Sequence, residues 1–316
     1  MTPTGSAGPG AAAGVGSVEK RLGGEGVCLD YGACVVRVRS AVGAFSGPFA
    51  SVYRHFSLGD AFPFVDFHVD IEPGAGLRRW LRPQSRFLID RVQPFDPFAA
   101  SHALPHYEWG LNWSFAQRFN QYVLLHAGVL AWGDAAVVLP AIPGSGKSTL
   151  TAALMLSGLR LLSDEFGVLR PQEGDFLPML KPVALKNASI EVIRHFHPGA
   201  ELGSTFPGTR KGDVAHLAPD AASVAAIRRP AQPRLILFPA WREGAALTLQ
   251  PQAPEQAFTR LAFNSFNYGL LGRIGFDAVA DLAEACPAYQ LVYGRLDDAV
   301  RCVHALLDQQ VGGADG

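Results

Sequence analysis

Residues 135–149 read AAVVLPAIPGSGKST, and this stretch decides the fold. An apolar run long enough for a buried strand leads into a small residue, four free positions and Gly-Lys-Ser, which is the pattern of a nucleotide phosphate-binding loop. Residues 149–156 are rich in leucine and alanine and favour a helix, which Gly158 can end. A strand, a glycine-rich loop and a helix in this order place the positive N-terminal end of the helix at a bound phosphate.

The loop predicts an ATP site. Successive main-chain N–H groups of such a loop turn inward and surround a phosphate chain. Lys147 is expected to reach the terminal phosphates, and the Ser148 hydroxyl is expected to bind Mg²⁺. The alternative is a Gly/Ser-rich turn that opens an ordinary helix. The predicted nucleotide-binding residues are Pro143, Gly144, Ser145, Gly146, Lys147, Ser148 and Thr149.

Two adjacent acids follow the loop helix directly. Residues 159–162 predict a strand, and Ser163-Asp164-Glu165 come at its end. Ligands of an open parallel sheet bind beyond the carboxyl ends of its strands, so we expect both acids near the loop, where they would hold Mg²⁺. Asp164 is the first candidate to accept a proton from an attacking hydroxyl. Neighbouring strand residues point in opposite directions, so both acids serve one site only if the backbone turns there. A solvated strand end is the alternative.

Three further polar side chains are candidate catalytic residues. His126 interrupts an apolar run just before the loop strand, either as a core histidine or as a group that relays a proton beside the acids. Arg210 and Lys211 lie in a basic loop flanked by glycines, residues 208–213. A cation from such a loop can neutralise the charge of a transferred phosphoryl group. The alternative is a solvated basic turn.

The composition narrows the class of protein. A formal net charge of −1 offers no electrostatic case for binding nucleic acid or an anionic membrane. The four cysteines lack metal-ligand spacing, and a reduced, cytoplasmic protein is the simpler interpretation; a Cys28–Cys34 bridge in an oxidising compartment is the alternative. The most apolar stretch, residues 123–142, is interrupted by polar and glycine residues. It predicts two strands joined by a turn at residues 132–134 rather than a membrane span.

We expect four parts along the chain. Residues 1–27 predict a disordered leader, 28–118 a small N-terminal α+β domain, 119–310 the domain that carries the phosphate loop, and 311–316 a loose tail. The alternation of strands and helices in 119–310 predicts a three-layer α/β core.

These residues together resemble the HPr kinase/phosphorylase family, and more closely its relatives called HprK-related kinase A. The wider resemblance consists of a histidine and a glycine on the preceding strand, the phosphate loop, and the acids after a single helix, a short spacing that many other phosphate-loop proteins lack. These are His126, Gly128, Gly144–Ser148 and Ser163–Glu165. The resemblance to the closer relatives adds Glu108–Asn112, Lys186, Asn187, Thr209–Gly212 and Asn264–Tyr268.

The resemblance implies a P-loop fold of the HPr kinase/PEP carboxykinase type and an ATP- and Mg²⁺-dependent kinase acting on a hydroxyl, the serine of a protein or peptide. Asp164 would match the acid/base carboxylate of the family, and His126 its supporting histidine. This chain departs from the family in two ways. It has Asp164-Glu165 instead of paired aspartates, and it has no good match to the C-terminal region with which the family recognises the carrier protein. The acceptor, the reverse phosphorolysis and the oligomeric state therefore stay open. A small-molecule kinase for a free serine-like acceptor and a non-catalytic nucleotide-binding regulator are the alternatives.

Overall fold

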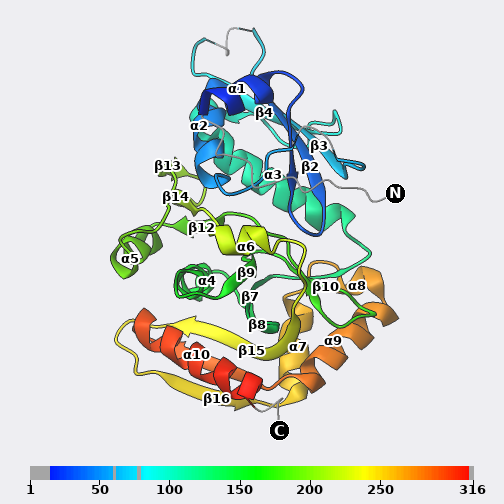
Figure 1. Ribbon diagram of the computed structural model, residues 1–316, viewed down its shortest axis with the longest axis vertical. Helices are drawn as coiled ribbons and strands as arrows, with labels where there is room; N and C mark the ends of the chain where they lie inside the picture. The colour runs from blue at the N-terminus through cyan, green and yellow to red at the C-terminus, as the bar shows by residue number, and fades with distance from the viewer. Residues whose placement is uncertain (1–14, 60–61, 77–79, 313–316) are drawn as a thin grey trace, which may run out of the picture.

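The computed structural model describes residues 15–59, 62–76 and 80–312 (Figure 1). Within these ranges the protein is mixed α/β, with one five-stranded sheet, one six-stranded sheet and two sheets of three strands. The five-stranded sheet and its helices lie at one end of the long axis, and the six-stranded sheet lies toward the other end (Figure 1). The α/β class predicted from the sequence is therefore correct at this level.

The N-terminal sheet has the order β1-β2-β3-β4-β5, with only β2 and β3 parallel. Its inward side chains, such as Val38, Ile71 and Phe87, form one core with Phe45 and Tyr107 from the helices on that face. The strands are β1 (Val27–Asp30), β2 (Val35–Ser40), β3 (Phe67–Pro73), β4 (Gln84–Ile89) and β5 (Phe98–Ala99). The helices are α1 (Val15–Gly23), α2 (Gly43–Val52) and α3 (Ala103–Arg118), with a 3-10 turn, η2 (Ala100–His102), before α3.

The structure contradicts part of the prediction at each end of the chain. Residues 15–27 are not disordered, because α1 buries Val18 and Leu22 and β1 begins at Val27. Val18 and Leu22 are four residues apart and share one helix face. At the other end α10 (Leu296–Gly312) includes the first two residues of the predicted tail. The remaining parts of both predictions, 1–14 and 313–316, lie outside the described residues.

The second large sheet has the order β16-β17-β15-β8-β7-β9. β15 is parallel to β8 and β17, whereas β7 is antiparallel to both β8 and β9. The carboxyl ends of β8, β9, β15 and β17 therefore meet at one edge, although β7 and β16 run the other way. The strands are β7 (Ala127–Trp132), β8 (Ala135–Pro140), β9 (Arg160–Ser163), β15 (Gln232–Trp241), β16 (Thr248–Gln252) and β17 (Ala288–Tyr293).

Helices cover both faces of this sheet. Along β8, Val137 and Leu139 share a core with α4 and α10, while Ala136 and Val138 share a second core with α7 and α9. Because both faces are covered, β8 is buried along its whole length, as its unbroken apolar sequence predicts. Besides α10, the helices on these two faces are α4 (Lys147–Leu156), α7 (Pro254–Phe263) and α9 (Arg273–Ala285).

The two small sheets connect the larger ones. One contains β6 (Val123–Leu125), β10 (Gly167–Leu169) and β11 (Phe176–Leu177); the other contains β12 (Val183–Lys186), β13 (Phe206–Thr209) and β14 (Gly212–Leu217). The second sheet lies between α3 and α4 (Figure 1). Short helices complete this part: α5 (Ala188–Phe196), α6 (Ala221–Ala225) and α8 (Tyr268–Leu271).

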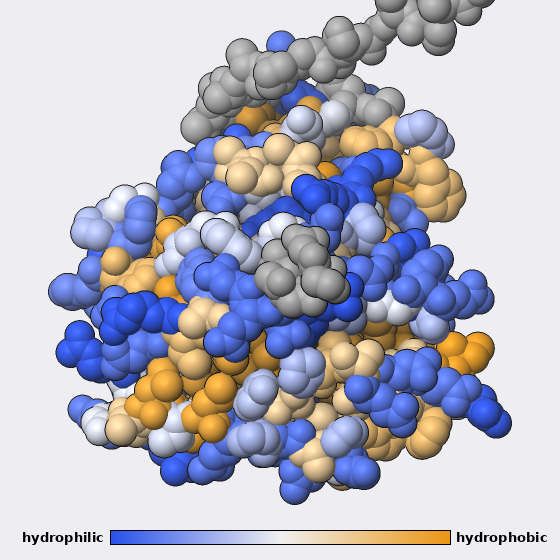
Figure 2. Space-filling model, turned by 60° about the horizontal axis from the view of Figure 1, so that its bottom comes forward, coloured by the Kyte–Doolittle hydropathy of each residue, from blue (hydrophilic) through white to orange (hydrophobic). Residues whose placement is uncertain are grey.

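The surface turned forward in Figure 2 is largely hydrophilic, with smaller hydrophobic groups of side chains between the polar ones. Within the described ranges, every helix is either too short or too polar to cross a bilayer. None of the four cysteines forms a disulfide, so Cys28 and Cys34 are not bridged to each other.

Candidate functional site

The predicted phosphate loop lies between β8 and α4 and is supported by the ends of β15 and β17. Gly144 and Gly146 have φ values of +85° and +88°, which other residues rarely adopt. A Cβ at Gly146 would lie 2.7 Å from the Tyr293 hydroxyl and 2.9 Å from Trp241 Cβ. The main-chain N–H of Trp241 donates to the Ser145 carbonyl (2.9 Å), and the Tyr293 hydroxyl donates to the Gly146 carbonyl (3.3 Å). Glycine at position 146 is therefore required by the close packing of the loop against these two strands.

A buried ion pair joins the loop to the acid after β9. Lys147 is the first residue of α4, and its Nζ lies 2.9 Å from Asp164 Oδ1. The same ammonium donates to the main-chain carbonyl of Asp164. The two side chains are only 7% and 3% exposed. The other carboxylate oxygen, Asp164 Oδ2, is buried and has no hydrogen-bond partner among the described residues. A buried oxygen of this kind is costly unless it binds a proton or a cation.

The backbone turns at the two acids, which is the condition for both to serve one site. β9 ends at Ser163, and the chain bends at Asp164 and Glu165. The Phe166 N–H donates to the Ser163 hydroxyl (2.9 Å) across this bend. Both acids consequently line the same pocket.

His126 lies beside the second acid. It occupies the junction of β6 and β7, where its main-chain N–H donates to the Asn264 carbonyl (2.6 Å). The Nε2 atom of its ring lies 3.4 Å from Glu165 Oε2. Burial alone would raise the pKa of Glu165, but the hydrogen bond from His126 and the charges of Lys147 and Lys186 outweigh burial and hold that pKa well below its usual range. Glu165 is therefore an anion at neutral pH.

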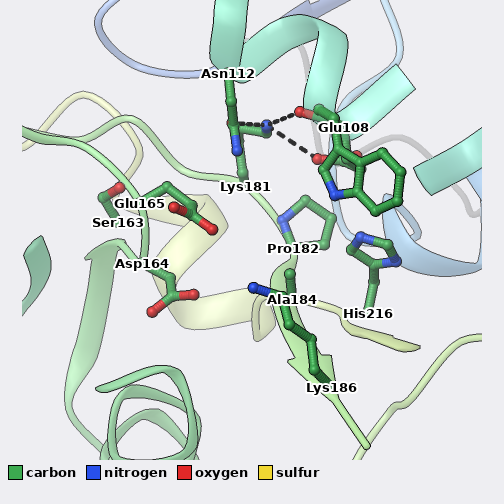
Figure 3. Close-up of a pocket in the computed structure, with 11 residues that line it drawn as sticks. Glu108, Asn112, Ser163, Asp164, Glu165, Lys181, Pro182, Ala184, Lys186 and His216 are labelled. Atoms are coloured by element: carbon green, nitrogen blue, oxygen red, sulfur yellow. Dashed lines mark hydrogen bonds and ion pairs between the residues drawn. The ribbon is translucent and has the colours of Figure 1, made fainter. Parts of the chain in front are cut away.

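The pocket beside the acids lies beneath α3 (Figure 3). It is lined by Glu108, Trp109 and Asn112 of α3, by residues 163–165, by residues of the segment 181–186, and by His216. Asp164 and Glu165 lie on one side of the close-up, and Pro182 and His216 lie on the other (Figure 3). The N-terminal unit, which is the five-stranded sheet with α1, α2 and α3, thus supplies one wall of the pocket.

A buried charge pair holds that wall in place. Lys181 Nζ lies 3.1 Å from Glu108 Oε2, and it donates to the Glu108 main-chain carbonyl (3.0 Å) and to the Asn112 side chain. Glu108 Oε1 accepts from the Tyr53 hydroxyl (2.6 Å). The Tyr53 hydroxyl in turn accepts from the hydroxyl of Tyr31 (3.1 Å). This network connects α2 and α3 to the segment that follows β11. Sequence reasoning included Glu108 and Asn112 only through the resemblance and missed Lys181, although a lysine between Leu180 and Pro182 in a mainly apolar run is itself a signal.

His216 on β14, like Asp164, is a buried pocket residue with unused hydrogen-bonding capacity. It is 1% exposed, and neither ring nitrogen has a partner within the described part of the chain. Burial lowers its pKa to about 4, so the ring is neutral at pH 7 and offers one donor and one acceptor.

Arg210 and Lys211 form the turn of the β13–β14 hairpin at the edge of this site. The Arg210 guanidinium lies 4.9 Å from the centre of the Phe98 ring, and Lys211 Nζ lies 5.3 Å from the centre of the Trp109 ring. Burial and then the charge of Lys186 lower the pKa of Lys211. Lys211 therefore covers the pocket residue Trp109 of α3, whereas Arg210 packs on Phe98 of β5, and neither of them lines the pocket.

The predicted Mg²⁺ ligands come from two places at the same sheet edge. Ser148 is half-buried in the first turn of α4, and Asp164 and Glu165 follow β9. Across the described ranges, no three His, Cys, Asp or Glu side chains form a cluster that could hold a metal by themselves. Protein-bound Mg²⁺ usually takes one or two carboxylates and completes its shell with phosphate oxygens and water. The carboxylates of Asp164 and Glu165 match this requirement beside a nucleotide.

No family model matches the chain, and a search of curated proteins finds no match either. The resemblance to the HPr kinase/phosphorylase family therefore stays a prediction based on the residues given above.

Proposed function

We propose that this protein is an ATP- and Mg²⁺-dependent kinase with a P-loop core of the HPr kinase type, which transfers the γ-phosphate to a hydroxyl, the serine of a protein or peptide. The observation that carries the proposal is the position of Asp164. One carboxylate oxygen of this pocket residue pairs with the lysine of the predicted phosphate loop, and the other has no partner in the part of the chain that the structure describes.

The loop residues would bind the triphosphate. The main-chain N–H groups of residues 143–149 and the N-terminus of α4 provide positive potential for the phosphates. Lys147 exchanges its pairing with Asp164 for the β- and γ-phosphates. Ser148, Glu165 and Asp164 Oδ1, the oxygen that Lys147 releases, would hold Mg²⁺, and the ion would supply positive charge that offsets the charge of the phosphates.

Asp164 would act as the base. Its Oδ2 accepts the proton of the acceptor hydroxyl, whose oxygen bonds to the γ-phosphorus as the bond to the β-phosphate oxygen breaks. Glu165 stays ionised because of His126 and the nearby lysines, so it serves the metal rather than the proton. Lys186 lines the pocket and Lys211 lies at its edge, and both can offset charge on the moving phosphoryl group.

The acceptor would enter the pocket beneath α3. Its walls come from α3, the 163–165 turn and the 181–186 segment, with the neutral His216 available to hydrogen bond to it. The free volume of the pocket is only about 10 Å³, the room of about one water molecule, so its walls must move apart to admit a serine side chain or a small hydroxylated molecule, the second candidate acceptor.

The test is a transfer assay. The protein is incubated with γ-labelled ATP and native lysate, and the labelled products are separated into macromolecular and small-molecule fractions and identified by mass spectrometry. We expect label in a protein or peptide serine, absent with Asp164→Asn. Label only in a small molecule would support the second candidate. Nucleotide binding with no labelled acceptor in either fraction would overturn the kinase proposal in favour of a regulator.

His126→Ala is expected to lower transfer about 10- to 100-fold, the usual cost of losing a group that orients a metal ligand. The substitution removes the hydrogen bond that holds the pKa of Glu165 down, so Glu165 binds Mg²⁺ less well. The measurement is the transfer rate as a function of Mg²⁺ concentration. His126→Gln keeps an N–H donor and should recover part of the rate. Equal Mg²⁺ dependence of His126→Ala and the wild type would contradict this role.

A further inference from the structure

The strand order sets the direction of a nucleotide on the loop. Across the sheet the strands lie in the order β17-β15-β8-β7-β9. The two acids follow β9, on one side of β8, the strand that leads into the loop, and β15 and β17 lie on the other side of β8. If the γ-phosphate lies beside Asp164, as the proposed function requires, the phosphate chain crosses the loop away from β9. The nucleoside then lies over the carboxyl ends of β15 and β17.

Trp241 occupies that position. It is the last residue of β15, pairs in register with Tyr293 of β17, and is 50% exposed. Its Nε1–H donates to the Gly294 carbonyl (3.3 Å), which directs the indole toward the end of β17. Its Cβ lies 2.9 Å from where a Cβ on Gly146 would be, so the residue is packed directly against the phosphate loop. A large aromatic side chain is thus anchored at both its main chain and its ring nitrogen while half of its surface faces solvent.

We propose that Trp241 is the platform on which the nucleobase stacks, an inference that rests on the proposed function. The face of an indole ring is large and has no hydrogen-bond donor, so it can stack on a nucleobase without hydrogen bonding to the edge that distinguishes one base from another. Stacking on an aromatic side chain tolerates every base and favours the larger ring systems. We therefore expect ATP and GTP to bind more tightly than CTP and UTP, with little discrimination between the two purines.

The test separates the base from the phosphates. Binding of ATP and of inorganic tripolyphosphate is measured by calorimetry for the wild type, Trp241→Ala and Trp241→Phe. We expect Trp241→Ala to weaken ATP about tenfold and to leave tripolyphosphate within about twofold of wild type, since base stacking on an aromatic ring is lost and the loop contacts are kept. Trp241→Phe should retain most of the ATP affinity.

Trp132 provides the matched control for fluorescence. It is 37% exposed but pairs with Ala135 at the start of β8, about 17 Å along the strand from the loop. We expect ATP to quench fluorescence in the wild type and in Trp132→Phe, and to quench much less in Trp241→Phe.

Each result decides between distinct conclusions. Unchanged ATP affinity in Trp241→Ala would overturn the platform while leaving the kinase proposal intact. Equal weakening of ATP and tripolyphosphate would also overturn it, because Trp241 would then only support the loop. Failure of the wild type to bind either ligand would overturn the proposed function itself.

Discussion

Asp164→Asn is expected to reduce phosphoryl transfer about 10²- to 10⁴-fold, the usual contribution of a general base, while ATP affinity changes little. Asparagine has nearly the same shape, and the main-chain carbonyl that accepts from Lys147 remains. What is lost is Oδ2, the buried carboxylate oxygen that has no partner within the described ranges. The measurements are the single-turnover transfer rate with saturating ATP and the ATP dissociation constant by calorimetry.

The control for this substitution is Asp175→Asn. Asp175 is also buried and also pairs with a cation, Arg170, but it lies on the β10–β11 connection. This variant removes a buried negative charge without touching the site and should keep the transfer rate. Transfer by Asp164→Asn within a few-fold of wild type would show that another group takes the proton.

Lys147→Ala is expected to destabilise the nucleotide-free protein by about 3–5 kcal/mol and to abolish tight ATP binding. Removing one partner of a buried ion pair leaves the other charge uncompensated. Here Asp164 would remain, 3% exposed, with neither oxygen paired to a cation. The free energy of unfolding from denaturant titration measures the first effect, and calorimetry with ATP measures the second.

The double variant Lys147→Ala/Asp164→Asn separates stability from binding. A neutral amide costs less to bury than an unpaired carboxylate, so the double variant should regain much of the lost stability without regaining ATP affinity. Equal stability of Lys147→Ala and the wild type would mean that the Lys147–Asp164 pair contributes nothing. Lys147→Ala alone is therefore a poor control for nucleotide binding, since a partly unfolded protein would give the same loss.

The parts of the fold that sequence predicted well are those with strong local signals. The apolar run of β8, the glycine loop and the leucine-rich α4 appear within about two residues of their expected bounds, because strand and helix preference there come from neighbouring residues. The leader prediction was wrong for residues 15–27 because glycine-rich composition concealed the two apolar residues that α1 buries. Composition averages over a segment, whereas burial depends on one helix face.

The sequence by itself determined which chemical groups surround the loop: a lysine at the start of α4, two acids after one helix and a histidine on the preceding strand. Only the tertiary structure decided which of them meet. Asp164 pairs with Lys147 while Glu165 turns to His126, because the chain bends after β9. Lys181 meets Glu108, 73 residues earlier, and closes the pocket from the N-terminal unit. Such pairings follow from strand order and backbone direction, which no local pattern of residue types contains.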